Sequence, residues 1–274
     1  MSSSVASTST ANSILERIFA AKRVEVEAER AAVPFEAIRE AARNAPAPRD
    51  FLTALRSRRP AVIAEIKRAS PSKGDILPGL DPAALARDYA ASGAAAISVL
   101  TDRHFKGSLE DLRTVRTAAN LPLLRKDFIF DPYQIHQAHA TGADCILLIA
   151  AMLKEADLAA LHAVARELGL QALVEVHNED ELRTAARAGA EIVGINNRDL
   201  HTFVTDIAVT ERLLRDYRGP ALIVSESGID TPEDIRRLDR AGARAFLVGE
   251  SLLRGGDPRR KLEALGAALG AAQG

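Results

Sequence analysis

The sequence has little of several residue types, and each shortage excludes a class of protein. One of its 274 residues, Cys145, is a cysteine, which excludes an internal disulfide framework and fits a reducing compartment. Because Cys145 lies in the apolar run CILLIAAM, we interpret it as a buried structural thiol. No apolar run approaches the ~20 residues that span a bilayer. The opening MSSSVASTSTANS lacks the basic region and apolar core of a secretory signal, so we expect a disordered tail over residues 1–13 and a cytoplasmic location.

An excess of charge of either sign is also missing. The 36 Lys and Arg residues balance 37 Asp and Glu residues, and the formal net charge is -1. This balance gives no electrostatic reason to expect nucleic acid or a membrane surface as a partner.

Common metal and nucleotide motifs are missing as well. The sequence contains no GxGxxG, no P-loop, no HExxH and no cysteine pair for zinc. We interpret His136 and His139, three residues apart on a predicted helix, as surface or interhelical residues rather than metal ligands. The other four histidines show no partner spacing: His104, His162, His177 and His201. We therefore expect no metal site and no organic cofactor.

Four short segments recur along the chain. They read SGAAAISVL from Ser92, TGADCILLI from Thr141, AGAEIVGI from Ala188 and AGARAFLVG from Ala241. Each has a glycine after an amphipathic stretch, as at a helix C-terminus, and then an apolar run typical of a strand buried on both faces. The recurrences lie about 50 residues apart, which is long enough for two βα units and predicts a further strand in each interval.

The intervening strands are present. They read AVIAEIK from Ala61, LPLLRKDF from Leu121, LQALVEV from Leu170 and ALIVSES from Ala221. Helical patterns separate the strands, and several open with Asp, Ser or Thr followed by Pro or an acidic residue, which is the chemistry of a helix N-terminus. Eight strands, each followed by a helix, predict an α/β fold, a (β/α)₈ TIM barrel over residues 61–274.

Residues 14–60 stand outside this count and predict an additional N-terminal helical segment. A charged amphipathic helix begins at Ile14, and NAPAPRDFLTALRS, from Asn44, predicts a proline-broken connector and a short helix. The sequence leaves open whether this extension caps the floor of the barrel or covers part of its mouth.

Ionisable residues gather where the strands end. In this fold the site lies at the C-terminal ends of the strands, and alternate strands fill each interior layer. Each odd-numbered strand carries one such residue, and we predict that the four lie in a single layer: Glu65, Lys126, Glu175 and Glu226. Lys67 lies one layer above them, and the sixth strand adds the amide of Asn196. An ion-pair network that only fixes the barrel is the alternative, but apolar residues would stabilise a barrel equally well, so the cluster favours acid/base catalysis.

The last two strands are followed by candidate phosphate-binding loops. Ser227-Gly228 follows the seventh strand and Gly249-Glu250-Ser251 the eighth, where many such barrels bind phosphate through backbone N–H groups. Ordinary turns are the alternative. The loop SPSKGD, from Ser70, carries Lys73 and is suited to closing over an anionic ligand.

Six segments together resemble the indole-3-glycerol-phosphate synthase family of tryptophan biosynthesis. They are EIKRASPSKG from Glu65, LRKDF, VEV, GINNRDL, SESGI and LVGESL, in the family's order and spacing, and the resemblance covers the chain from about Ile14. It implies a carboxy-lyase that closes the ring of 1-(2-carboxyphenylamino)-1-deoxyribulose 5-phosphate, with loss of CO₂ and water. The partner it implies is therefore a small phosphorylated molecule.

The resemblance also implies roles for individual residues. Lys126 resembles the general acid, and Glu175, assisted by Lys67, the group that handles protons during dehydration. The other implied catalytic residues orient these groups or complete the site: Glu65, Asn196, Glu226 and Ser227. The implied substrate contacts are Ser70 and Arg198 for anionic groups, Phe128, Leu148 and Leu247 for the aromatic ring, and the backbone of Gly228, Gly249 and Glu250 for phosphate.

Three other functions remain possible when the residues alone are considered. A Schiff-base sugar-phosphate aldolase would use Lys126 as a nucleophile. A phosphoribosylanthranilate isomerase shares the fold but does not account for two lysines and three glutamates. A non-catalytic phosphate-binding module leaves the charged layer unexplained. For the oligomeric state we expect a monomer, with a weak dimer as the alternative.

Overall fold

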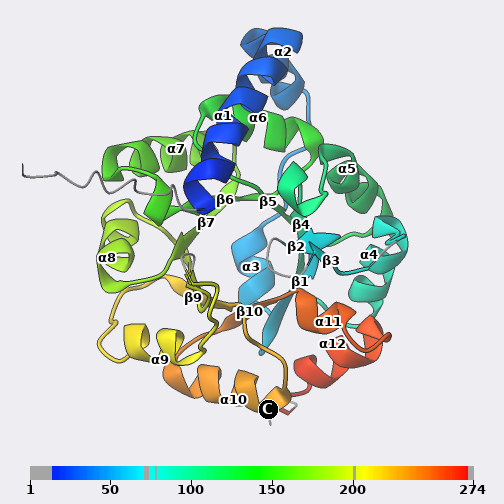
Figure 1. Cartoon of the computed structure of the whole chain (residues 1–274), viewed down its shortest axis with the longest axis vertical. Helices are drawn as coiled ribbons and strands as arrows, with labels where there is room; N and C mark the ends of the chain where they lie inside the picture. Colours follow the sequence, from blue (N-terminus) through cyan, green and yellow to red (C-terminus); the bar gives the residue numbers. More distant parts are fainter. Residues whose placement is uncertain (1–13, 71–73, 78, 200–201, 271–274) are drawn as a thin grey trace, which may run out of the picture.

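The computed structural model describes residues 14–70, 74–77, 79–199 and 202–270, and within them eight parallel strands close into one barrel (Figure 1). Around the ring each strand pairs with its neighbour in the chain, and the last pairs with the first. The barrel strands are β1 Ala61–Ile66, β4 Ala96–Leu100, β5 Leu123–Lys126, β6 Cys145–Ile149, β7 Gln171–Val176, β8 Ile192–Asn196, β9 Leu222–Glu226 and β10 Ala245–Val248. A small antiparallel pair, β2 Ala69–Ser70 and β3 Gly74–Asp75, follows β1. The predicted (β/α)₈ barrel is confirmed.

Helices surround the barrel, and their ends follow the predicted chemistry. Asp131 and Thr231 each form a capping box before a proline at the first helical turn, and Gly142 and Gly242 end those two helices with φ of 94° and 118°. The helices are α4 Pro82–Ala91, α5 Leu109–Ala118, α6 Pro132–Thr141, α7 Glu155–Glu167, α8 Glu179–Arg187, α9 Ala208–Leu214, α10 Pro232–Ala241, α11 Glu250–Leu253 and α12 Pro258–Gly266, with 3₁₀ turns η1 Arg103–Phe105 and η2 Ala150–Met152. None of them combines the length and apolar character needed to cross a bilayer, as far as the described residues extend.

The strands separate two apolar cores. Successive side chains of a strand point to opposite faces, so each barrel strand contributes to both. In β1, Val62, Ala64 and Ile66 pack in the outer core, between the strands and the helices, while Ile63 belongs to the core inside the barrel. Glu65 shares the inner face with Ile63 and is placed at the upper end of that core. Cys145 is a free, buried thiol, as predicted.

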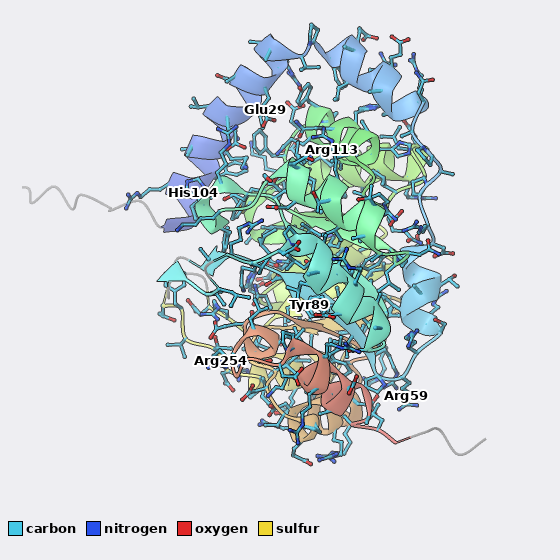
Figure 2. The ribbon with its side chains drawn as sticks, turned by 90° about the vertical axis from the view of Figure 1, so that its right-hand side faces the viewer. Glu29, Arg59, Tyr89, His104, Arg113 and Arg254 are labelled. Carbon is cyan, nitrogen blue, oxygen red and sulfur yellow. The ribbon has the colours of Figure 1, made fainter. Side chains whose placement is uncertain are left out.

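The N-terminal segment covers both ends of the barrel. Helix α3 (Phe51–Arg56) closes the floor: Phe51 and Leu55 are buried in the inner core, and the backbone N–H groups of Phe51 and Leu52 donate to Gln171 Oε1 at 2.5 and 3.0 Å. Helix α1 (Ile14–Ala32) lies at the opposite end, on the side of His104 (Figure 2). The extension therefore both caps the floor of the barrel, through α3, and covers part of its mouth, through α1.

A third helix of the extension, α2 (Phe35–Arg43), was not predicted. It follows Pro34, has Glu36 in its first turn, and packs on α6, where the Phe35 ring lies 5.2 Å from the His136 ring. The interhelical role predicted for His136 is thereby confirmed. The helix has only nine residues, four of them charged, and Pro34 and Glu36 are the start signals that the sequence offers.

Candidate active site

A cavity of about 480 Å³ opens at the C-terminal ends of the barrel strands. It has the position and size expected of a small-molecule site in this fold. The predicted site residues that line it are Glu65, Lys67, Lys126, Phe128, Glu175, Asn196, Arg198, Glu226, Ser227, Gly228, Leu247, Gly249 and Glu250.

Two buried ion-pair groups form the floor of this cavity. Lys126 Nζ lies 3.0 Å from Glu175 Oε2 and 3.4 Å from Glu226 Oε2. Beside them, Lys67 Nζ lies 2.9 Å from Glu65 Oε1. The predicted convergence of the charged side chains from the odd-numbered strands is therefore confirmed, and every carboxylate has a cation against it.

The two glutamates that share Lys126 differ in their proton affinity. Burial raises the pKa of Glu226 to about 8, against the opposing effect of Lys126. Burial also acts on Glu175, but the charges of Lys126 and His177 outweigh it and lower the pKa of that carboxyl below its ordinary value. Burial likewise opposes the charge on Lys126, yet Glu175 and Glu226 together raise its pKa above that of a free lysine. The site thus holds an ammonium, a carboxylate and a carboxyl side by side at neutral pH.

Two glycines make room for the carboxylates inside the barrel. A Cβ at Gly194, in β8, would collide with Glu226 Oε1, and a Cβ at Gly249, after β10, would collide with Glu65 Oε1. Glycine within a strand often marks such a close approach. Sequence reasoning missed Gly194, and assigned Gly249 to phosphate binding alone.

Gly194→Ala should therefore lower kcat by about 10²-fold, because the added methyl group pushes the Glu226 carboxylate away from Lys126. Steady-state turnover measures the effect, and circular dichroism verifies the fold. Gly266→Ala, where a Cβ meets open space on α12, is the matched control. An alanine at position 194 with full kcat would show that the position of Glu226 does not matter.

The loops after β8 and β9 are held by hydrogen bonds near the charged floor. Asn196 hydrogen-bonds Glu175, and its Oδ1 accepts from the Arg198 backbone N–H at 3.0 Å. Ser227 has a left-handed backbone with φ of 65°, and the buried Asn197 donates to its carbonyl at 3.1 Å. Asn197 was not among the predicted site residues. It maintains the strained turn that presents Ser227 and Gly228 to the cavity.

The apolar wall of the cavity differs from the prediction in one residue. Phe128 and Leu247 line it as expected. Leu148 does not: it packs in the outer core against the helices, and its neighbours Leu147 and Ile149 face the cavity instead. The expected ring contact of Leu148 is therefore wrong, because a displacement by one residue moves a strand side chain to the other face.

Some predicted features lie outside the described residues. Ser70 belongs to β2, but its side chain is not described. Lys73, in the loop that we expect to close over a ligand, is not described either. The tail expected over 1–13 lies outside the described ranges too. Within those ranges no group of three or more His, Cys, Asp or Glu side chains is arranged to hold a metal ion.

Comparison with known proteins connects this geometry to a family. A family model described as indole-3-glycerol phosphate synthase matches residues 15–265. The chain belongs to the indole-3-glycerol phosphate synthase family. Its activity is that of the family, a decarboxylating lyase reaction.

Relatives named indole-3-glycerol phosphate synthase match almost end to end. One from Roseiflexus sp. (strain RS-1) is 53% identical over 265 residues, covering 93% of this chain and 98% of the relative. One from Chromobacterium violaceum is 49% identical over 257 residues, covering 92% of this chain and 97% of the relative. Among solved structures, 3-hexulose-6-phosphate synthase from Salmonella typhimurium superposes with a TM-score of 0.61 at 14% identity, over 76% of this chain and 98% of that one. At that identity the likeness shows the barrel fold alone.

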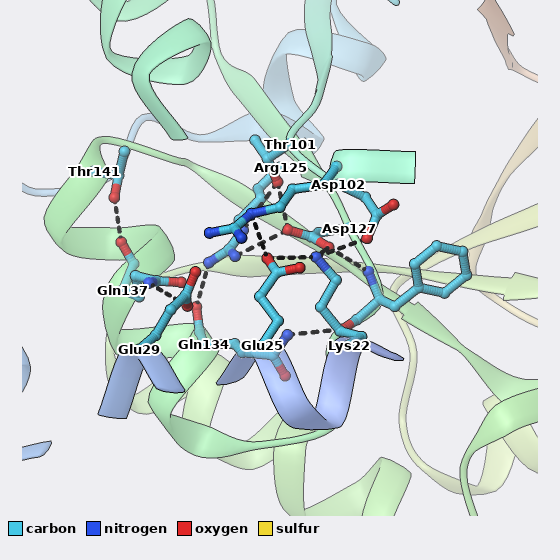
Figure 3. A network of polar contacts seen from close by, with 12 residues as sticks. Lys22, Glu25, Glu29, Thr101, Asp102, Arg125, Asp127, Gln134, Gln137 and Thr141 are labelled. Atoms are coloured by element: carbon cyan, nitrogen blue, oxygen red, sulfur yellow. Dashed lines mark hydrogen bonds and ion pairs between the residues drawn. The ribbon is translucent and has the colours of Figure 1, made fainter. Parts of the chain in front are cut away.

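In this member of the synthase family, α1 is joined to the site by a buried ion-pair network (Figure 3). Lys22 is 1% exposed. Its Nζ lies 2.7 Å from Asp102, 3.0 Å from Asp127 and 3.0 Å from Glu25. Burial opposes the charge of Lys22, but the two aspartates outweigh it and raise its pKa. Sequence reasoning missed Lys22, because a lysine on a charged helix usually faces solvent.

Asp127 connects this network to the synthase site. It follows Lys126 directly, and its carboxylate accepts from Thr101 at 2.6 Å, Arg125 at 3.0 Å and the backbone N–H of Phe128 at 2.9 Å. The end of β5 is therefore fixed on both sides of Lys126. Ile18, one turn before Lys22, lines the cavity, so the same network seats α1 as part of the wall.

Lys22→Met should destabilise the protein by about 3–5 kcal/mol, because it leaves Asp102 and Asp127 buried with too little positive charge. Urea unfolding followed by circular dichroism measures the change. Arg17→Met, an exposed position on the same helix, is the control. Equal free energies of unfolding for the Lys22 variant and the wild type would rule out the network as a structural anchor.

Proposed function

We propose that the cavity closes the ring of 1-(2-carboxyphenylamino)-1-deoxyribulose 5-phosphate to give indole-3-glycerol phosphate, CO₂ and water. The observation that supports this most is the position of Lys126, held as an ammonium between two buried glutamates at the floor of the cavity. An apolar wall on one side suits the aromatic ring of the substrate. Glycine-containing loops after β9 and β10 suit its phosphate.

In the first step, the ring carbon that bears the carboxylate attacks the ketone carbon of the substrate. Negative charge develops on the ketone oxygen, and Lys126 stabilises it and donates the proton that makes it a hydroxyl group. The new C–C bond interrupts the aromaticity of the ring, and loss of CO₂ returns the bonding electrons to it. Glu65 and Asn196 orient the ammonium groups and the substrate.

In the second step, the hydroxyl group leaves as water and the five-membered ring becomes an indole. A proton must reach the departing oxygen, and another must leave the ring system. Lys67 assists by supplying the proton to the departing oxygen, and Glu175, which the site keeps ionised, accepts the proton that leaves the ring system. Glu226 and Ser227 complete the enclosure around the reacting atoms.

Binding is assigned to the rest of the cavity. Phe128 and Leu247 contact the aromatic ring, and Leu147 and Ile149 take the place first assigned to Leu148. Arg198 contacts anionic groups of the substrate. The phosphate accepts from backbone N–H groups of the loops after β9 and β10: Gly228, Gly249 and Glu250.

The Schiff-base alternative is disfavoured by the same geometry. An amine attacks a carbonyl only as the free base, and enzymes that use lysine in this way lower its pKa. Here Glu175 and Glu226 raise the pKa of Lys126 instead.

A direct assay tests the proposed function. Purified protein is incubated with the carboxyphenylamino-deoxyribulose phosphate, and indole fluorescence is followed. We expect a rise in fluorescence matched by release of CO₂, whereas folded protein that produces neither would overturn the assignment. We also propose that the enzyme is cytoplasmic and monomeric, and gel filtration tests the oligomeric state.

A further inference from the structure

His177 follows β7 directly and is buried beside the charged floor of the cavity. Its side chain is 14% exposed, and its Nδ1 lies 3.1 Å from Glu181 Oε2. The backbone N–H of His177 donates to the same oxygen at 2.8 Å, which fixes the ring relative to α8. Its other ring nitrogen, Nε2, lies 3.5 Å from Glu175 Oε1 and has no hydrogen-bond partner among the described residues. The imidazole therefore faces Glu175.

The side chains form a continuous chain from the surface to the catalytic lysine. Glu181, in the first turn of α8, is held by Asn178, whose Nδ2 donates to Glu181 Oε1 at 2.6 Å. Glu181 in turn contacts the ring of His177. The ring faces one oxygen of Glu175, and the other oxygen of Glu175 accepts a hydrogen bond from Lys126 at 3.0 Å. Glu175 thus lies between an imidazole and an ammonium.

This arrangement distinguishes two glutamates that are otherwise alike. Glu175 and Glu226 are both buried and both contact Lys126, at 3.0 and 3.4 Å. Only Glu175 has an imidazole within 4 Å in the part of the chain that the structure describes. Glu226 Oε1 has no hydrogen-bond partner within the same described ranges.

We propose that His177 is a positioning residue, which as an imidazolium keeps Glu175 ionised and directed at Lys126, and leaves the shared proton to Glu226. Protonation of the ring agrees with its surroundings. Burial opposes its charge, but Glu181 and Glu175, with a smaller effect of Glu226, raise the pKa of His177 above its ordinary value. The facing charges are Glu175 from β7, Glu181 from α8, Glu226 from β9 and, beyond Glu175, Lys126 from β5.

The pH dependence of kcat tests this role, which rests on the proposed function of Glu175 as a proton acceptor. His177→Gln keeps a hydrogen-bonding group but removes the positive charge, so the pKa of Glu175 rises and less of it is ionised at low pH. We expect the acidic limb of the kcat profile to move to higher pH by at least about one unit. At pH values well above the limb, kcat should return towards that of the wild type.

A control and a second variant make the outcome decisive. His162→Gln removes a buried histidine on α7 and should leave the profile where it is. Glu181→Gln removes the carboxylate that holds the ring and raises its pKa, so the pH at which the His177 ring titrates, followed by NMR, should fall below that of the wild type; this tests the chain even if His177→Gln does not fold. A kcat profile of folded His177→Gln that superimposes on that of the wild type, or a His177 ring that titrates at the same pH in Glu181→Gln as in the wild type, would overturn the proposal, while an inactive wild type would overturn the proposed function instead.

Discussion

Lys126→Ala should lower kcat by about two orders of magnitude or more, with a smaller effect on KM. The change removes the proton donor and the positive charge that stabilises the developing oxyanion, while the binding wall and the phosphate loops stay in place. It also removes the cation that Glu175 and Glu226 share, so Glu226 should keep its proton to still higher pH. Steady-state turnover followed by indole fluorescence gives kcat and KM together.

Two further variants sharpen this prediction. Lys126→Arg keeps a positive charge beside the glutamates but carries a group that does not give up its proton, so the fold should be preserved and kcat should stay low. Lys154→Ala removes an exposed lysine before α7 and should leave kcat unchanged. An alanine variant of Lys126 with the kcat of the wild type would rule out its assigned role.

Glu175→Gln should lower kcat by about 10²–10⁴-fold, because an amide cannot accept the proton that leaves during dehydration. The same substitution removes a negative charge that raises the pKa of Glu226. With Lys126 left to a single carboxylate, Glu226 should ionise at lower pH than its present value of about 8, and any remaining activity should change its pH dependence accordingly.

Kinetics over a range of pH tests both parts of this prediction. Glu179→Gln, an exposed glutamate at the start of α8, serves as the control. If Glu175→Gln retained full kcat with an unshifted profile, proton transfer would have to be assigned to another group.

The convergence of the charged side chains was predictable because it follows from covalent geometry. Side chains alternate along a strand, and parallel strands in a barrel end at the same edge. Glu65, Lys126, Glu175 and Glu226 each stand near the end of an odd-numbered strand, so their register followed once the strands were recognised. The loops that contain Gly228 and Gly249 followed from the same count.

The features that were missed depend on distance in space rather than on position in the sequence. Lys22 lies on a separate helix, and nothing in its own segment shows that Asp102 and Asp127 face it. Gly194 is required by the carboxylate of Glu226 on the next strand. Leu148 shows the other limit, since an apolar run without polar residues does not reveal which of its side chains face inward.

His177 is a different kind of omission, because its signal was in the sequence. It stands two residues after Glu175 and four before Glu181. The first spacing places two side chains on the same side of a strand, and the second suits a contact with the first turn of the following helix. Sequence reasoning considered the histidines only as metal ligands and therefore missed these carboxylate partners, as it missed Asp102, which lies 2.9 Å from the ring of His104.

The central claim is that two buried carboxyl groups hold Lys126 as an ammonium, ready to donate a proton. ¹⁵N NMR of the Lys126 side chain, assigned by comparison with Lys126→Arg, measures its charge directly. We predict an ammonium signal that persists through about pH 10, where an ordinary lysine begins to lose its proton. A neutral amine in the resting enzyme near pH 7 would contradict the claim and favour a nucleophilic lysine instead.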